Sequence, residues 1–92
     1  MEEKTYKEIS RERNKIWHLK DVENASAILE MTKIMKEHGD LENPKELKEA
    51  EEELKRKIYV AKTYKTKSTD EEIEKAIEAG KLKQRKEMKG WF

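Results

Sequence analysis

The chain has 92 residues, of which 47% are charged and 34% are hydrophobic. Its 22 basic and 21 acidic residues nearly balance, so net charge gives no general attraction to nucleic acid or to a membrane surface. Cysteine is absent, which excludes disulfides, thiolate metal sites and thiol catalysis. The abundance of Lys and Glu, with one Pro and three Gly, is typical of long amphipathic helices, so we expect one all-α domain over 1–92.

The first predicted helix runs over about 3–38 and is apolar on two opposite sides. Asp21 is a potential cap for a separate second helix, but the apolar spacing keeps its phase across Lys20 and favours one unbroken helix that ends at Gly39. At about 100° per residue, a first apolar face contains Tyr6, Ile9, Ile16, Trp17, Ala27, Ile28, Met31, Ile34 and Met35. A second apolar face, roughly opposite, contains Leu19, Val22, Ala25 and Leu29. A helix with two apolar sides is expected to be covered on both.

Two further helices are predicted over about 44–66 and 69–89. Asn43, Pro44 and Glu46 form a start signal for the former, and Ser68 or Thr69 followed by acidic residues starts the latter. Gly80 either admits a closely approaching backbone or ends the last helix early. The core-facing residues are expected to be Leu47, Ala50, Leu54, Ile58, Ala61 and Tyr64, and then Ile73, Ile77, Gly80, Gln84, Met88 and Trp91. We therefore expect an all-α three-helix bundle, with an antiparallel helical hairpin packed on the long first helix.

The hairpin is expected to cover the first apolar face and to leave the second one free. Its limited length leaves the first turns of helix one, with Tyr6 and Ile9, beyond the hairpin. The second apolar face is then the predicted protein interface, with Tyr59 and Leu82 added because they lie off the apolar faces of their own helices. The predicted interface residues are His18, Leu19, Val22, Ala25, Leu29, Tyr59 and Leu82. Its occupant is another protein or a second copy of the chain.

Two basic runs, 55–67 and 81–89, raise a nucleic-acid-binding alternative. Basic side chains with interleaved aromatics grip phosphates and stack on bases. The candidate contacts are Lys55, Arg56, Lys57, Lys62, Lys65, Lys67 and Arg85. An antiparallel hairpin, however, places 55–67 beside the acidic 70–74 and places 81–89 beside the acidic 46–53. We therefore rank nucleic acid below protein as a partner.

No motif predicts catalysis, a cofactor, a metal site or a small-molecule substrate. His18 and His38 lie on different faces and lack the spacing of a helical metal site. Many carboxylates precede Lys or Arg by four residues, which is a helix-stabilising arrangement rather than an acid and base in a cleft. No signal peptide and no apolar run of about 18 residues is visible, so we expect no membrane partner. A cytoplasmic location agrees with these features, although they do not define the compartment.

The segments 42–57 and 67–81 resemble computationally designed helical proteins in their explicit capping, leading acids and trailing bases. Irregular residues elsewhere, such as Trp17, His18 and Asn24, depart from that style. The resemblance implies an idealised scaffold with an irregular, target-facing surface. We therefore expect a non-enzymatic protein-binding helical module. The alternatives are a basic nucleic-acid-binding or virus-type helical protein and a structural homo-oligomeric bundle.

Overall fold

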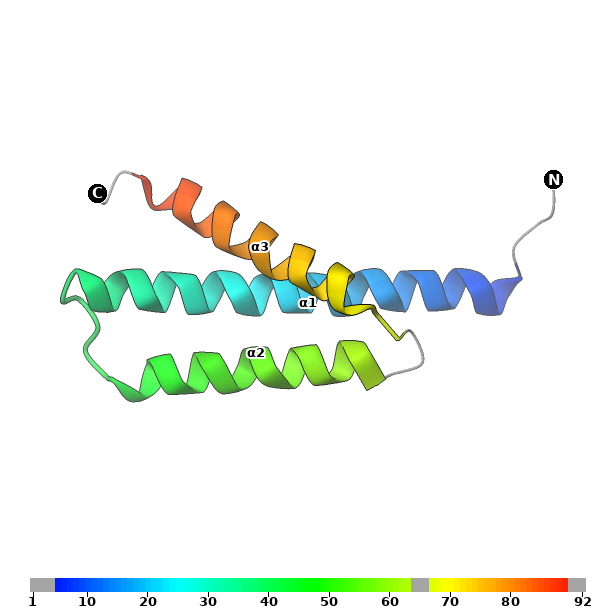
Figure 1. The fold of residues 1–92 in the computed structure, drawn as a ribbon, viewed down its shortest axis with the longest axis horizontal. Helices are drawn as coiled ribbons and strands as arrows, with labels where there is room; N and C mark the ends of the chain where they lie inside the picture. Colours follow the sequence, from blue (N-terminus) through cyan, green and yellow to red (C-terminus); the bar gives the residue numbers. More distant parts are fainter. Residues whose placement is uncertain (1–4, 64–66, 90–92) are drawn as a thin grey trace.

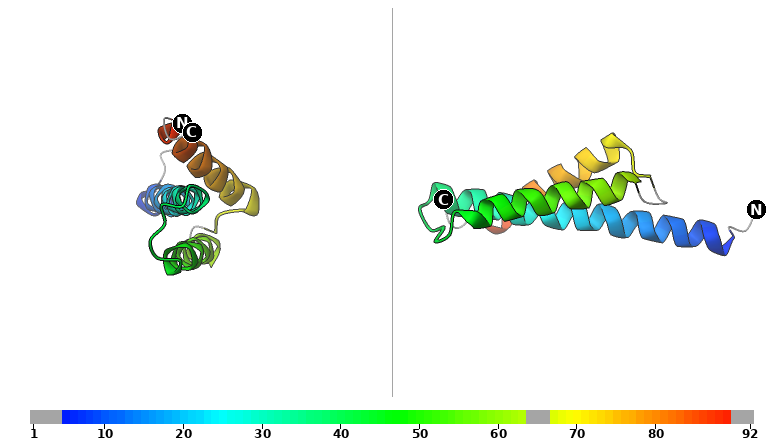
Figure 2. Two further views of the ribbon diagram at one scale, coloured as in Figure 1. Left: turned by 90° about the vertical axis from the view of Figure 1, so that its left-hand side faces the viewer. Right: turned by 90° about the horizontal axis from the view of Figure 1, so that it is seen from below.

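The computed structural model describes residues 5–63 and 67–89, which form three helices (Figure 1). α1 spans Tyr6–Glu37, α2 spans Lys45–Thr63 and α3 spans Asp70–Glu87. α2 runs antiparallel along one side of α1, and α3 crosses α1 obliquely on another side (Figures 1 and 2). α1 packs against both helices, whereas α2 and α3 contact each other only over a small region. The predicted all-α bundle with a long first helix is confirmed.

α1 is continuous across Lys20, as predicted, and both of its ends are capped. At its start, the side-chain oxygen of Thr5 accepts a hydrogen bond from the Glu8 N–H at 3.3 Å. At its end, the Asp40 N–H donates to the Met35 carbonyl at 2.8 Å and the Gly39 N–H donates to the Lys36 carbonyl at 3.1 Å. This pattern is a Schellman cap, and it needs the positive φ of 75° that Gly39 adopts.

α2 and α3 begin at the residues that the capping signals indicate. The Asn43 Oδ1 accepts a hydrogen bond from the Lys45 N–H at 3.0 Å. Thr69 and Glu72 form a reciprocal capping box at the start of α3. α3 continues through Gly80 to Glu87, two residues short of the predicted end. The predicted end of the second helix at 66, together with Tyr64 and Trp91, lies outside the described residues.

The core lies in the angle between the three helices. Its centre is formed by one residue from each helix, Val22, Ala61 and Ile73, each at most 3% exposed. Partly buried apolar side chains surround this centre, namely Leu19, Leu54, Ile58, Ala76 and Ile77. α2 and α3 therefore turn their predicted apolar faces inward.

The second apolar face of α1 forms the core side of that helix, contrary to prediction. Val22, Ala25 and Leu29 are buried, and Leu19 is half-buried. α2 and α3 do not lie side by side on the first apolar face. Instead they lie on two sides of α1 and enclose the second face between them (Figure 2). The prediction that these residues remain free for a partner is wrong.

Small residues explain why the helices pack on this side of α1. A Cβ added to Gly80 would stand 2.3 Å from the Glu23 carbonyl oxygen, so the backbones of α1 and α3 come very close. At the same crossing, the Ser26 hydroxyl donates to the Ile77 carbonyl at 2.7 Å. Close packing requires small side chains where backbones approach. Gly80 of α3 and Ser26 and Ala27 of α1 supply them at this crossing.

α1 extends beyond both other helices at its N-terminal end (Figure 1). Tyr6 is 86% exposed on this extension, as expected from the helix lengths. The molecule is elongated, with extents of 55 × 25 × 19 Å. Within the described ranges, no helix has both the length and the apolar character needed to cross a membrane.

Candidate protein-docking surface

An exposed face of α1 points away from both α2 and α3. Its residues recur every three or four positions, which places them on one side of the helix. We call this the outer face, and it consists of Tyr6, Ile9, Arg13, Ile16, Trp17, Lys20, Asn24 and Ile28. From Tyr6 to Ile28 it is about 33 Å long at the usual helical rise.

The outer face carries most of the large apolar side chains that reach solvent. Among the described residues, eight large hydrophobic side chains are exposed, and five of them lie on this face. Ile16 and Trp17 at its centre are 65% and 64% exposed. Single exposed apolar residues are ordinary on protein surfaces, but several gathered on one side of one helix indicate an interaction site.

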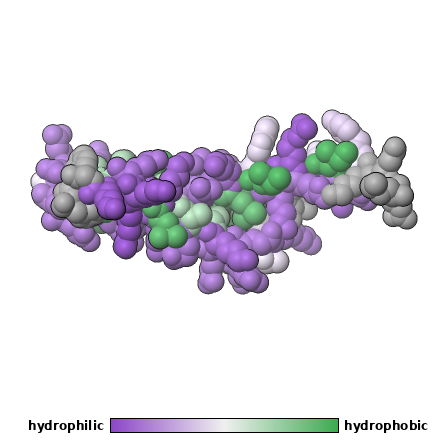
Figure 3. Space-filling view, turned by 90° about the horizontal axis from the view of Figure 1, so that it is seen from above, coloured by the Kyte–Doolittle hydropathy of each residue, from purple (hydrophilic) through white to green (hydrophobic). Residues whose placement is uncertain are grey.

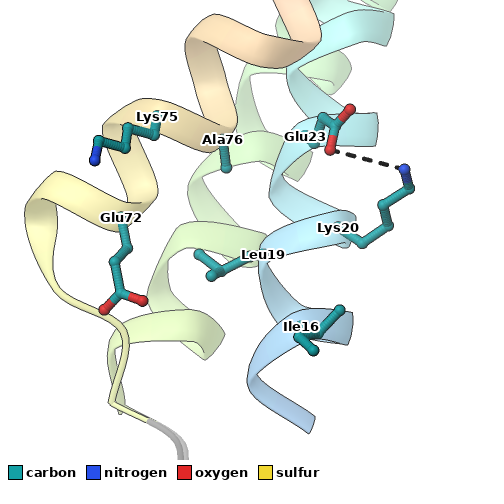
Figure 4. A pocket seen from close by; sticks show the side chains of 7 residues that line it. All are labelled: Ile16, Leu19, Lys20, Glu23, Glu72, Lys75 and Ala76. Atoms are coloured by element: carbon teal, nitrogen blue, oxygen red, sulfur yellow. Dashed lines mark ion pairs between the residues drawn. The ribbon is translucent and has the colours of Figure 1, made fainter. Parts of the chain in front are cut away.

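A groove between α1 and α3 adjoins the outer face at Ile16 (Figure 4). It has a volume of about 390 Å³. Ile16, Leu19 and Ala76 supply its apolar lining, and Figure 4 places charged side chains from both helices around them. Lys20 pairs with Glu23 there at 3.8 Å. The groove thus widens the apolar surface around Ile16 toward α3.

A second groove, of about 490 Å³, adjoins the other end of the outer face between α1 and α2. Ile28, Met31 and Thr32 line it from α1. The α2 side contributes Glu46, Glu49, Ala50, Glu53 and Arg56. Arg56 pairs with Glu53 at 2.8 Å. Glu46 and Glu49 are exposed, and their carboxylates make no ion pair with other described residues.

The outer face together with the α1–α2 groove is therefore electrically polarised along α1. The N-terminal half carries Arg13 and Lys20, and the outer face contains no acidic residue. The C-terminal half lies beside the acidic groove with Glu46 and Glu49. Such an arrangement selects a partner by charge as well as by apolar contact.

Seen from above, most of the molecular surface is hydrophilic (Figure 3). The apolar areas form a broken row, which continues onto the part of α1 that extends beyond α3 (Figure 3). The lower-left part of that row lies over α3, where Leu82 and Ala79 belong to a shallow groove with Glu71, Glu74 and Glu78. The exposed apolar surface is thus interrupted by charged side chains rather than continuous around the molecule.

The predicted interface residues do not form one surface. Val22, Ala25 and Leu29 are in the core, and His18 and Leu19 are half-buried at its edge. Tyr59 and Leu82 are 68% and 66% exposed, but they lie on α2 and α3 respectively. Neither is part of the outer face.

The basic residues of the nucleic-acid alternative are divided between two sides of the molecule. Arg56 and Lys57 both pair with Glu53, and Lys62 pairs with Asp70 at 2.9 Å. Arg85 pairs with the buried Glu30 of α1 at 2.9 Å. Lys55 and Lys67 are exposed, and Lys65 lies outside the described residues. The expected pairing of 81–89 with 46–53 is wrong, because α2 and α3 diverge on different sides of α1.

The most strongly held carboxylate at the rim of the α1–α3 groove is Glu72. Lys15 binds its Oε2 at 2.8 Å, and the Thr69 backbone N–H donates to its Oε1 at 3.1 Å. The hydrogen bond from Lys15, followed by that from the Thr69 backbone, lowers the pKa of Glu72 below its ordinary value. The contact joins α1 to the start of α3 and fixes one edge of the groove.

Clusters that could bind a metal ion are not found in the part of the chain that the structure describes. No three His, Asp or Glu side chains there gather closely enough to hold a metal ion. Carboxylates on the helix surfaces instead meet basic neighbours, as in the Glu71–Lys75 pair at 3.7 Å. Such exposed pairs stabilise helices weakly.

Sequence reasoning assigned Ile16, Trp17 and Ile28 of the outer face to the core, and it placed Tyr6 and Ile9 on the exposed extension. The available signal was the distribution of charge on α1. Arg13 and Lys20 interrupt the first apolar face, while Ala25 and Ser26 mark the other side as the place where a backbone can approach. Side-chain size together with charge was the better guide to the core side.

Comparison with protein-family models, with curated proteins and with solved structures finds no match to this chain.

Proposed function

We propose that this chain is a non-enzymatic protein-binding module that docks through the outer face of α1. The observation that carries the proposal is the row of five large exposed apolar side chains on one side of one helix. Helices commonly bind proteins by laying such a row, spaced three and four residues apart, against an apolar surface. Both flanking grooves enlarge the area that a partner covers.

Ile16 and Trp17 are the expected anchors. They lie at the centre of the outer face and are each nearly two-thirds exposed. Complete burial of a side chain of this kind contributes about 1.5–3 kcal/mol, part of which is offset by the loss of motional freedom on binding. Arg13 and Lys20 lie beside the anchors, where charged groups govern the rate and specificity of association.

The nucleic-acid alternative has less support. Four of its seven candidate cations are paired with carboxylates within the chain, and Arg85 lies on α3 whereas Arg56, Lys57 and Lys62 lie on α2. A phosphate would have to compete with those pairs.

The resemblance of 42–57 and 67–81 to designed helical proteins supports the protein-binding proposal, since it implies an idealised scaffold with a target-facing surface.

The test compares substitutions on the outer face with matched substitutions elsewhere. A two-hybrid selection with the chain as bait, and with a second copy among the prey, supplies partners that are then purified. Each partner is titrated against the wild-type chain and the Ile16→Glu and Trp17→Ser variants by calorimetry. We expect each variant to weaken binding by about tenfold or more, because the anchor is lost.

The matched controls are Leu82→Glu and Tyr59→Ser, which change side chains of nearly the same exposure on α3 and α2. We expect both to bind like the wild-type chain. Equal binding by all four variants, or a larger loss in the controls, contradicts the proposal. Circular dichroism of each variant confirms that it remains helical.

A further inference from the structure

We infer that the partner of the outer face is a second copy of this chain, docked antiparallel about a two-fold axis near Asn24. This inference rests on the proposed function and adds the identity of the partner. Each copy then contributes the same surface, as a two-fold interface requires. Three features of the outer face support a second copy: the apolar contact that Trp17 gains, the match of charges and the size of the surface.

The register brings the exposed Trp17 to an apolar side chain of the second copy. Trp17 and Met31 lie the same number of residues on either side of Asn24, so Trp17 of one copy faces Met31 of the other. A thioether against an aromatic ring is a favourable contact. Lys20 is opposite Ile28 by the same symmetry, and the two Asn24 amides meet at the axis. A polar residue at such a position fixes the register of paired helices.

Charges also match in this orientation. Arg13 of one copy lies opposite Met35 of the other. Met35 is one helical turn beyond Met31 and Thr32, and these two residues line the acidic groove together with Glu46 and Glu49. The basic half of one outer face therefore meets the carboxylates of the other copy, and the reverse contact forms at the other end. A parallel arrangement instead places Arg13 beside Arg13 and the acidic grooves side by side, which is repulsive. The outer face is self-complementary only when antiparallel.

The available area predicts a weak dimer. With the axis at Asn24 the two α1 helices overlap over residues 11–37, about 39 Å at the usual helical rise, and a strip of this length on a helix about 10–12 Å wide buries several hundred Å² per copy, near the lower end of specific interfaces. We therefore expect a dissociation constant in the micromolar range. Sedimentation equilibrium at protein concentrations from about 1 to 300 μM should show an average mass that rises from 11.0 kDa toward twice that value as the fraction of dimer increases.

A charge-swap experiment tests the antiparallel pairing. One variant carries Arg13→Glu and Lys20→Glu, and the other carries Glu46→Arg and Glu49→Arg. Each variant alone opposes like charges at both ends of the dimer, so we expect self-association to weaken by about tenfold or more. Mixing the two variants restores opposite charges at both ends. The mixed dimer should return to within about threefold of the wild-type affinity.

Lys83→Glu with Lys86→Glu is the control, because it makes the same change of net charge on an exposed part of α3. We expect its association to match that of the wild-type chain. Failure of the mixture to associate, or an equal loss in the control, overturns the inference. The inference is also wrong if the chain stays monomeric at 300 μM. Binding of the monomeric chain to phosphatidylserine vesicles would not change that conclusion.

The inference and the proposed function fail in different ways. If the chain is monomeric and a different selected protein still requires Ile16 and Trp17, only the second-copy inference is wrong. If neither a second copy nor any selected protein depends on Ile16 or Trp17, the proposed function is wrong too.

Discussion

Two residues six positions apart on α1, Ile16 and Val22, have opposite environments. Val22 is fully buried among Ala61 and Ile73, whereas Ile16 is 65% exposed. Hydropathy alone ranks both as core residues. Their difference follows from where α2 and α3 contact α1, since the helices approach the side that carries Ala25 and Ser26.

Stability measurements distinguish these two environments. We expect Val22→Ala to lower the free energy of unfolding by about 2 kcal/mol, because it removes buried methyl groups and leaves a cavity. Ile16→Ala should change it by less than about 0.5 kcal/mol, as is usual at exposed positions. Urea denaturation at low micromolar concentration, where the chain is monomeric, measures both values. Equal effects, or a larger effect at Ile16, contradict the assignment of the core.

The pKa of Glu72 reports on the contact between α1 and the start of α3. Because the pKa is lowered in the folded state, this contact stabilises the fold above the ordinary carboxyl pKa of about 4.3. The contribution is lost as pH falls through the lowered folded value. We expect Lys15→Met to raise the pKa of Glu72 toward its ordinary value in a carbon-detected NMR titration. Lys75→Met, which removes the partner of Glu71 instead, should leave it unchanged.

At the residue scale, the sequence predicted the core faces of α2 and α3 but not that of α1. α2 and α3 each have one apolar face, so Ala61 and Ile73 have only one possible orientation. α1 offers two faces, and their assignment depends on how the other helices are placed around it. That placement is a property of the packed molecule, and the apolar spacing of α1 alone does not specify it.

At the element scale, the crossing of α1 and α3 depends on Gly80. A Cβ added to Gly80 would lie 2.3 Å from the Glu23 carbonyl oxygen, and it would also meet Ala27 and Ser26. A glycine inside a helix ordinarily costs about 1 kcal/mol relative to alanine. Here the closer approach of the two backbones outweighs that cost.

We expect Gly80→Ala to destabilise the chain by about 2 kcal/mol or more, despite the better helix propensity of alanine. Thermal and urea denaturation measure the change. Gly39→Ala is the comparison, since it costs about 1–2 kcal/mol through its left-handed backbone alone and meets no neighbouring atom. Faster amide exchange throughout α3 should appear only in Gly80→Ala. A stabilised Gly80→Ala variant shows that the crossing is looser than described.

The helix ends were the most predictable feature of the chain. Asn43, Thr69 and Gly39 act locally, through hydrogen bonds to residues within a few positions, so their roles are visible in the sequence. The pairing of charges between α2 and α3 was less predictable. Lys62 meets Asp70 near the connection, but farther along the two helices separate. Pairing at a distance depends on the crossing angle, which Gly80 and Ser26 set.

At the scale of the whole molecule, the arrangement leaves an extended shape and a small core. The radius of gyration is 15.8 Å. A compact domain of this length has a value of about 12 Å. α1 is the shared element, with α2 and α3 on two sides and its outer face exposed (Figure 2). The sequence predicted that the second apolar face of α1 is left uncovered within the chain, whereas the exposed apolar side chains lie on the outer face.

The most direct test of the account is the fluorescence of Trp17 as the protein concentration rises. In a Trp91→Phe background Trp17 is the only tryptophan, and it is 64% exposed on the outer face. A second copy covering that face removes water from the indole, so we expect the emission maximum to move to shorter wavelength between about 1 and 300 μM, in step with the mass from sedimentation. Adding Arg13→Glu and Lys20→Glu should abolish the shift. An emission maximum that does not change while the mass doubles shows that the copies meet elsewhere, and it contradicts the outer face as the docking surface.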